Sequence, residues 1–183
     1  ELLAAPRPTH RDTPLAVLDL GTGSGAIALA VKHACRTADV TATDASPTAL
    51  QVARANAFRL ALNVTFASGS WWDAVPGRCF DLILSNPPYI AGADSHLAAL
   101  THEPLEALTP GGDGLDSLRA IVAAAARHLE RSGWLLLEHG YDQSQMVQGM
   151  LHEQGFEAIE TRVDLAGLPR CTGARRPITG ALV

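Results

Sequence analysis

Short apolar runs alternate along this chain with longer segments whose apolar residues recur at helical spacing. The strand-like runs are residues 15–20, 40–43, 63–68, 80–85 and 133–139. The helix-like segments are residues 26–34, 46–60 and 115–129, with a further helix around 146–151. Repeated strand–helix–strand units predict an α/β fold, in which helices cover both faces of a mostly parallel sheet. In such sheets a ligand binds beyond the carboxyl ends of the strands, where the strand order reverses.

Local signals mark the ends of two predicted helices. Ser46 is a good N-cap residue, and Pro47 suits the first helical position. Gly155 follows the last apolar-periodic segment and is predicted to end that helix. Beyond it, residues 156–161 and 176–183 are predicted to form a closing pair of strands.

The composition indicates one globular domain. The chain has 183 residues, of which 47% are hydrophobic and 18% charged. A net charge of −5, with Lys32 as the only lysine, argues against a large nucleic-acid footprint. The cysteines, Cys35, Cys79 and Cys171, are too widely spaced for a disulfide framework or a zinc site. This cysteine pattern favours the cytoplasm, and we expect a monomer without a metal. No apolar run is long enough to span a bilayer, so we expect no membrane partner.

A glycine-rich turn follows the first predicted strand. Gly21, Gly23 and Gly25 alternate with Thr22 and Ser24 immediately before the first predicted helix. Glycine permits a positive φ and lets the backbone approach a ligand closely. The spacing differs from the dinucleotide fingerprint, and the turn lacks the lysine of a phosphate loop. A cofactor without a pyrophosphate or triphosphate therefore suits this turn better than a nucleotide does.

Acidic and aromatic side chains complete the predicted cofactor site. Asp44 ends the second strand, where its carboxylate can accept hydrogen bonds from both hydroxyls of a ribose. Asp19 is predicted to orient the glycine turn or to bind an amino group of the cofactor. Trp71 is predicted to lie against adenine with Ser70 at a polar edge of the base, while Trp72 packs in the core. A plain turn with Asp44 as a helix cap is the structural alternative, but the combination favours S-adenosyl-L-methionine.

An asparagine, two prolines and a tyrosine end the fourth predicted strand. An amide or aromatic amine nitrogen has no free lone pair, because its electrons are delocalised into a planar system. The Asn86 side chain and a backbone carbonyl beside Pro87 can accept hydrogen bonds from both N–H groups of such a nitrogen. Pro87 and Pro88 fix φ and carry no competing donor, and Tyr89 supplies a flat face. The structural alternative is a rigid exit from the strand with Tyr89 covering the core.

Six motifs together resemble the methyltransferase domain of the release-factor protein-glutamine methyltransferases. They are VLDLGTGSGAIALA, TDASPTAL, GSWWDAV, FDLILSNPPYI, EPLEALTPGGDGLDSLRAI and LLLEHG, which extend the resemblance from about Leu15 to the C-terminus. The Asn-Pro-Pro-Tyr motif alone is shared with methyltransferases that act on adenine amines of DNA and RNA. The segment EPLEALTPGGDGL favours the protein-glutamine branch.

The resemblance implies a Rossmann-like class I fold, with a seven-stranded, mostly parallel sheet whose last strand is antiparallel. It also implies methylation of the glutamine side-chain amide in the Gly-Gly-Gln motif of class 1 peptide chain release factors. By position, Gly21 to Gly25, Asp44 and Trp71 would hold the cofactor. Asn86 would contact both cofactor and substrate, and residues 87–89 would hold the glutamine amide. The alternatives are an adenine amine of DNA or RNA, a ribosomal-protein glutamine, or a non-catalytic binding domain.

The sequence departs from the family pattern in two respects. Residues 15–183 are interpreted as the methyltransferase domain and residues 1–14 as a linker or remnant. The resemblance implies an N-terminal helical domain that helps to bind the release factor, and this sequence does not include it. The chain is then either a fragment or docks its substrate weakly, and we expect a fragment. Ser70 stands where relatives often carry an acidic residue, so we expect adenine recognition to differ in detail.

Overall fold

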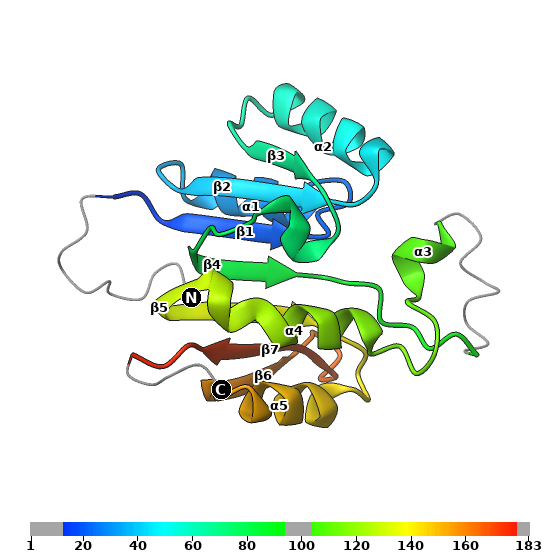
Figure 1. Ribbon diagram of the computed structural model, residues 1–183. Helices are drawn as coiled ribbons and strands as arrows, with labels where there is room; N and C mark the ends of the chain where they lie inside the picture. Colours follow the sequence, from blue (N-terminus) through cyan, green and yellow to red (C-terminus); the bar gives the residue numbers. More distant parts are fainter. Residues whose placement is uncertain (1–12, 94–103, 179–183) are drawn as a thin grey trace.

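A single seven-stranded sheet forms the centre of the computed structural model, which describes residues 13–93 and 104–178 (Figure 1). The strand order is β3-β2-β1-β4-β5-β7-β6. The strands are β1 (Ala16–Leu20), β2 (Asp39–Asp44), β3 (Thr65–Ser68), β4 (Phe80–Ser85), β5 (Leu129–Glu138), β6 (Glu157–Val163) and β7 (Pro169–Arg175). Only β7 runs antiparallel to its neighbours, β5 and β6, among the strands described. The mostly parallel sheet is as predicted.

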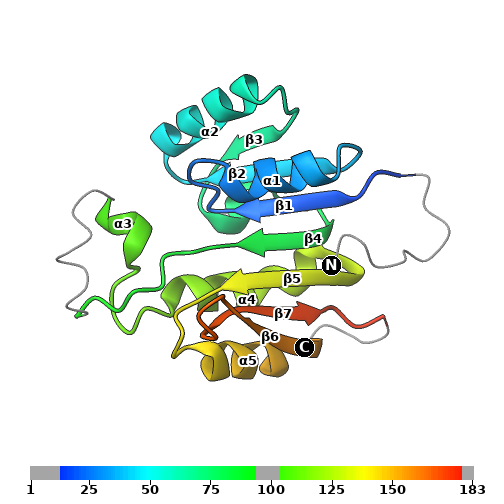
Figure 2. The same cartoon turned by 180° about the vertical axis from the view of Figure 1, so that it is seen from behind.

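Helices cover both faces of the sheet. They are α1 (Ala26–Ala34), α2 (Pro47–Arg59), a 3-10 turn η1 (Trp71–Ala74), α3 (Leu105–Leu108), α4 (Asp116–His128) and α5 (Ser144–Glu153). Figure 1 shows α4 in front of the sheet, and the opposite view in Figure 2 shows α1 in front of it. Apolar residues of α4 and α5 belong to one core cluster, and Ala28 and Val31 of α1 belong to a second cluster on the other face.

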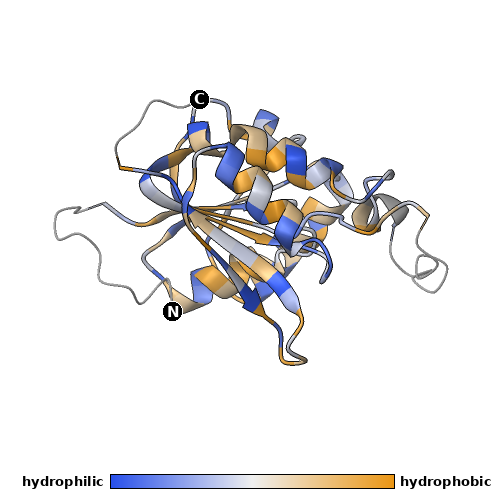
Figure 3. Cartoon of the chain, turned by 90° about the horizontal axis from the view of Figure 1, so that it is seen from below, coloured by the Kyte–Doolittle hydropathy of each residue, from blue (hydrophilic) through white to orange (hydrophobic). Residues whose placement is uncertain are grey.

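Burial of apolar side chains explains why these layers pack together. Leu18 and Ile83 of the central strands, and Leu118 and Ile121 of α4, are completely buried in the larger cluster. Figure 3 shows hydrophobic and hydrophilic residues alternating along the helices, as expected of helices with one face on the sheet and the other in water. None of the helices in the described ranges is long and apolar enough to cross a bilayer.

The predicted helix signals are confirmed. The Ser46 side chain accepts a hydrogen bond from Ala49 N (3.3 Å), and Pro47 is the first residue of α2. Gly155 adopts a φ of 74° just after α5, where its amide bonds to His152 O. The predicted linker, residues 1–14, falls almost entirely outside the described residues.

Of the predicted closing pair, the strand at residues 156–161 is confirmed by β6. The second strand is wrong for residues 176–178, which follow β7 and belong to no strand, and residues 179–183 lie outside the described part of the chain. A short turn explains the difference, because Asp164 N bonds to Leu168 O (2.8 Å) and the chain reverses at once into β7. Thr172 and Ala174 of β7 are small and buried, so this strand lacks the large apolar residues that made 176–183 look strand-like.

Candidate active site

The strand order reverses between β1 and β4, and two predicted motifs meet at this point. Leu20 pairs with Ser85 in the parallel ladder, and Ser85 Oγ donates a hydrogen bond to Leu20 O (2.8 Å). The next residues along the two strands are Gly21 and Asn86. The glycine turn and the Asn-Pro-Pro-Tyr segment therefore leave neighbouring strands side by side, at the edge where sheets of this kind bind ligands.

The glycine turn has a backbone that only glycine adopts readily. The φ angles of Gly21, Gly23 and Gly25 are 68°, 55° and 86°, all in the left-handed region. The turn is joined to β2 through Thr22 N, which bonds to Thr43 O (2.8 Å). A Cβ on Gly21 would lie 3.3 Å from Cζ3 of Trp71, so the turn and η1 are in close contact.

Asp19 supports the turn from inside the protein and keeps one oxygen without a partner. Its side chain is 1% exposed, and Oδ2 accepts hydrogen bonds from Thr22 Oγ1 (2.6 Å) and Ala28 N (3.0 Å). Oδ1 has no hydrogen-bond partner among the described residues. Burial, opposed by these two hydrogen bonds, raises the pKa of Asp19 from 3.8 to about 6. The unsatisfied oxygen fits a ligand that brings an N–H donor or a positive charge.

Asp44 joins the glycine turn to the start of α2. Its Oδ2 accepts a hydrogen bond from Gly23 N (2.8 Å), and its Oδ1 accepts one from Ser46 N (2.8 Å). The N-cap of α2 is Ser46, so Asp44 is not the capping residue of the structural alternative. A carboxylate oxygen can accept more than one hydrogen bond, which leaves Asp44 able to bind the hydroxyls of a sugar.

The remaining predicted cofactor residues differ in their surroundings. Ser24 and Ser70 are exposed, and Ser24 O accepts a hydrogen bond from Asn56 Nδ2 (2.9 Å).

The two tryptophans of η1 have different neighbours. Trp71 is half-buried beside the glycine turn, whereas Trp72 stacks on His128 with ring centroids 4.6 Å apart. The indole N–H of Trp72 donates to Ala120 O (3.2 Å). Trp72 therefore packs against α4, as expected, and the contact of Trp71 with adenine stays a prediction.

Asn86 and Tyr89 occupy opposite ends of a rigid segment. Asn86 is exposed, with no hydrogen bond to its side chain among the described residues, and Pro87 is buried. The Tyr89 hydroxyl donates to Glu138 Oε1 (3.4 Å) at the end of β5, and its ring packs against the larger core cluster. An exposed amide at the switch point, supported by buried neighbours, can accept hydrogen bonds from a planar nitrogen.

Sequence reasoning missed the residues that hold this segment from behind. Gln143 Nε2 donates to Tyr89 O (2.8 Å), and a Cβ on Gly114 would lie 2.4 Å from the same oxygen. The run of glycines at 111, 112 and 114 signals an unusual backbone, but nothing in the sequence identifies Tyr89 as its partner. Gln143 carries no sequence signal of its own.

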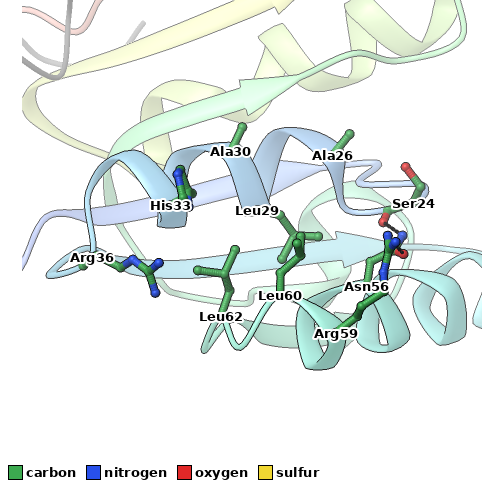
Figure 4. A pocket seen from close by; sticks show the side chains of 10 residues that line it. All are labelled: Ser24, Ala26, Leu29, Ala30, His33, Arg36, Asn56, Arg59, Leu60 and Leu62. Atoms are coloured by element: carbon green, nitrogen blue, oxygen red, sulfur yellow. Dashed lines mark hydrogen bonds between the residues drawn. The ribbon is translucent and has the colours of Figure 1, made fainter.

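A groove of about 460 Å³ lies between α1 and α2, away from the Asn-Pro-Pro-Tyr segment (Figure 4). Leu29, Leu60 and Leu62 form its apolar part, and His33, Arg36 and Arg59 also line it. Ser24 is the one predicted site residue in its lining. The groove is therefore distinct from the site at the strand ends. In the part of the chain with described structure, no group of His, Cys, Asp and Glu could hold a metal ion.

Comparison with known proteins supports the resemblance on which the sequence expectations rest. A model of the methyltransferase small-domain family matches residues 8–115, which include every predicted site residue. The chain is 51% identical over 164 residues to a release factor glutamine methyltransferase of Xylella fastidiosa, covering 88% of this chain and 60% of that protein. Identity to the proteins of the same name in Coxiella burnetii and Bordetella pertussis is 45% over 167 residues and 48% over 160 residues. These alignments cover 91% and 86% of this chain and 60% and 59% of the relatives, so the chain spans about three-fifths of their length.

Solved structures share the fold at low sequence identity. A methyltransferase from Pyrococcus furiosus superposes with a TM-score of 0.70 at 20% identity, covering 93% of this chain and 79% of that one. A ribosomal protein L11 methylase from Lactobacillus delbrueckii gives 0.66 at 24% identity, covering 90% and 72%. A 16S rRNA methyltransferase from Thermus thermophilus, in complex with AdoMet and guanosine, gives 0.64 at 21% identity, covering 90% and 38%. The fold is the Rossmann-like class I fold of S-adenosyl-L-methionine-dependent methyltransferases, as expected.

Proposed function

The chain belongs to the methyltransferase small-domain family, and from this premise we propose that it methylates the glutamine side-chain amide in the Gly-Gly-Gln motif of class 1 peptide chain release factors. The methyl donor in this proposal is S-adenosyl-L-methionine, and the product is S-adenosyl-L-homocysteine. One observation carries the proposal: the Asn-Pro-Pro-Tyr segment leaves β4 directly beside the glycine turn that leaves β1. Identity near 50% to proteins named release factor glutamine methyltransferases supports the choice of substrate.

The residues around the glycine turn fit this cofactor. The Asp19 Oδ1 atom, buried and without a partner among the described residues, suits the amino group of the methionine part. Asp44 suits the ribose hydroxyls, and the glycine backbone from Gly21 to Gly25 can approach the cofactor closely. Trp71 offers a flat face for adenine, with Ser70 beside it. The cofactor supplies a methyl group on a positively charged sulfur.

The Asn-Pro-Pro-Tyr segment positions the acceptor nitrogen. The Asn86 side-chain oxygen and a carbonyl beside Pro87 accept hydrogen bonds from the two N–H groups of the glutamine amide, and Tyr89 packs on its plane. This contact holds the nitrogen with its reactive face toward the methyl carbon. As the N–C bond forms, the S–C bond breaks and the nitrogen releases one proton to solvent. Orientation of this kind can lower a barrier by as much as about 7–11 kcal/mol.

The same geometry suits a planar adenine amine, so the choice of substrate needs a direct test. An enzyme that binds a base in duplex DNA needs a basic groove, whereas this chain has a net charge of −5. The three cysteines are free, in keeping with the cytoplasm in which we place the reaction.

The test is transfer of labelled methyl from S-adenosyl-L-methionine to a panel of purified acceptors. The panel contains a class 1 release factor, the same factor with its motif glutamine replaced by asparagine, ribosomal proteins, tRNA, rRNA and duplex DNA. We expect label in the unmodified release factor and none in its asparagine variant. Label in nucleic acid or in a ribosomal protein, with none in the release factor, would overturn the proposed substrate.

A further inference from the structure

The peptide unit between Tyr89 and Ile90 is bonded on both sides. Its carbonyl, Tyr89 O, accepts a hydrogen bond from Gln143 Nε2 at 2.8 Å, and its amide, Ile90 N, donates to Leu108 O at 3.0 Å. These two bonds determine the orientation of the peptide plane and therefore ψ of Tyr89. The hydroxyl of Tyr89 is bonded separately, to Glu138.

The two prolines limit which backbone groups of the Asn86–Tyr89 segment can form hydrogen bonds to the rest of the protein. Pro87 and Pro88 have no N–H groups, so the backbone between Asn86 and Tyr89 cannot donate a hydrogen bond to the scaffold. A residue that holds the segment through its carbonyls must bring a donor. Gln143 brings that donor from the start of α5, 54 residues farther along the chain.

The orientation of the Gln143 amide is unambiguous. Its Oε1 accepts a hydrogen bond from Gly140 N at 2.8 Å, while its Nε2 donates to Tyr89 O. An exchanged oxygen and nitrogen would set an acceptor against an acceptor and a donor against a donor. The residue is 5% exposed, so water offers little replacement for either bond.

The backbone of Gly114 also lies against the Tyr89 carbonyl oxygen. Gly114 has a φ of 80°, and a Cβ there would lie 2.4 Å from Tyr89 O and 3.1 Å from Gln143 Nε2. The backbone at Gly114 and the amide of Gln143 therefore enclose Tyr89 O together. Gly92 N, bonded to Gly112 O at 3.1 Å, extends the contact along the chain.

We propose that Gln143 is a positioning residue for the methyl-transfer site: by donating to Tyr89 O, it holds the Asn86–Tyr89 segment in the conformation that receives the acceptor amide. This inference rests on the proposed function, because it assumes that the segment receives the acceptor. Gln143 acts through Tyr89 and has no contact with the substrate. Its loss is expected to lower kcat more than the affinity for S-adenosyl-L-methionine, since every proposed cofactor residue except Asn86 lies on or next to β1, β2 and η1.

Substitution of Gln143 by glutamate and by leucine tests the role of the donor. In Gln143→Glu the ionised carboxylate can still accept from Gly140 N but cannot donate to Tyr89 O. The protonated form can donate, and burial raises the pKa of a carboxyl at this position. We expect kcat of Gln143→Glu to be about 10²-fold below wild type at alkaline pH and to recover relative to wild type as the pH falls. Gln143→Leu is expected to show the loss at every pH.

Matched comparisons isolate the effect of the new carboxyl. Among the described residues, the titratable groups around this amide include Asp142 and His139, which lie beside Gly140, Glu138, which contacts Tyr89, and Asp113, which precedes Gly114 and pairs with Arg119. These groups are present in wild type and in Gln143→Leu, so they cannot produce a recovery seen only in the glutamate variant. Gln148→Glu, on the same helix, contacts Thr161 and not the site, and is expected to retain wild-type kcat.

Hydrogen exchange at Ile90 N gives a readout that does not depend on the substrate. After correction for the intrinsic pH dependence, we expect its protection to fall in Gln143→Leu and to return in Gln143→Glu at low pH. Equal activity of all variants and wild type at every pH would overturn the proposal, as would unchanged protection at Ile90. If wild-type protein modifies no release factor while the exchange result holds, the proposed substrate is wrong and the positioning role stands.

Discussion

At the scale of single residues, Asp19 is the clearest case of a buried side chain whose surroundings point to ligand binding. Its carboxyl is buried under the glycine turn, yet one of its oxygens has no partner among the described residues. A buried acceptor without a donor costs stability, by about 1–3 kcal/mol or more. Such a cost is expected where a ligand later supplies the missing donor.

The pH dependence of stability tests this view of Asp19. Its pKa of about 6 in the folded protein lies above the ordinary value of 3.8, so the folded state holds the proton more tightly than the unfolded state. The stability that protonated Asp19 provides is fully present below about pH 4 and is lost as the pH rises through 6. Relative to Asp19→Asn, wild type is expected to lose about 2 kcal/mol of unfolding free energy between pH 4 and pH 7.

Urea unfolding of both proteins at a series of pH values measures this difference. The asparagine variant is the control, since it keeps an oxygen for Thr22 and Ala28 but does not titrate. A constant difference between the two proteins across this pH range would show that Asp19 is not held in the protonated form by burial.

At the scale of elements, the site depends on short segments that join strands to helices. The turn at residues 111–114 approaches the Asn-Pro-Pro-Tyr segment so closely that a Cβ at Gly114 would meet Tyr89 O at 2.4 Å. Gly114→Ala is expected to lower both thermal stability and methyl transfer, because a positive φ alone costs about 1–3 kcal/mol in a residue with a Cβ.

Gly149→Ala is the matched control for this substitution. Gly149 lies within α5, and a Cβ there would meet nothing within 4 Å. Because alanine favours a helix over glycine by as much as about 1 kcal/mol, this variant is expected to be at least as stable as wild type. Calorimetric melting curves of both variants provide the comparison, and full activity in Gly114→Ala would contradict the described contact.

The two tryptophans of η1 are expected to have separate roles. Trp72→Ala removes the stack on His128 and the hydrogen bond to Ala120 O, so it is expected to lower stability with little change in cofactor affinity. Trp71→Ala, beside the glycine turn, is expected to weaken cofactor binding by roughly 10-fold with a smaller loss of stability. Calorimetric binding of S-adenosyl-L-homocysteine, together with melting curves, separates the two effects. The reverse pattern would assign adenine to Trp72.

The elements also show which parts of the fold the sequence can predict. Helix α2 has Ser46 as N-cap and Pro47 at its first position, and α1 follows the glycine turn directly, so the positions of both helices follow from local chemistry. Strand β7 has no such signal, because its buried residues are small and its place between β5 and β6 depends on pairing with distant strands. The same reason explains the site: Gly21 and Asn86 carry local motifs, whereas the bond from Gln143 to Tyr89 joins segments far apart in sequence.

At the scale of the whole molecule, the order of the strands places the glycine turn and the Asn-Pro-Pro-Tyr segment next to each other. Because β1 and β4 are neighbours, residues 65 positions apart in sequence meet where Ser85 bonds to Leu20. Apart from Asn86, the proposed cofactor residues come from β1, β2 and the segments that follow β1 and β3, and the proposed acceptor residues come from the segment after β4. A transferase that must bring donor and acceptor together benefits from this division, since each half of the site can be held by its own strands.

The most direct test of the proposed methyl transfer is the position of the methyl group on a release factor after incubation with the protein and S-adenosyl-L-methionine. Mass spectrometry of the peptide that contains the Gly-Gly-Gln motif locates the modification, with Asn86→Ala as the comparison. We expect a methyl group on the glutamine side-chain amide from wild type, and a rate at least about 10²-fold lower from Asn86→Ala, which we expect still to bind the cofactor. A methyl group on any other residue, or equal rates from the two proteins, would contradict the proposed function.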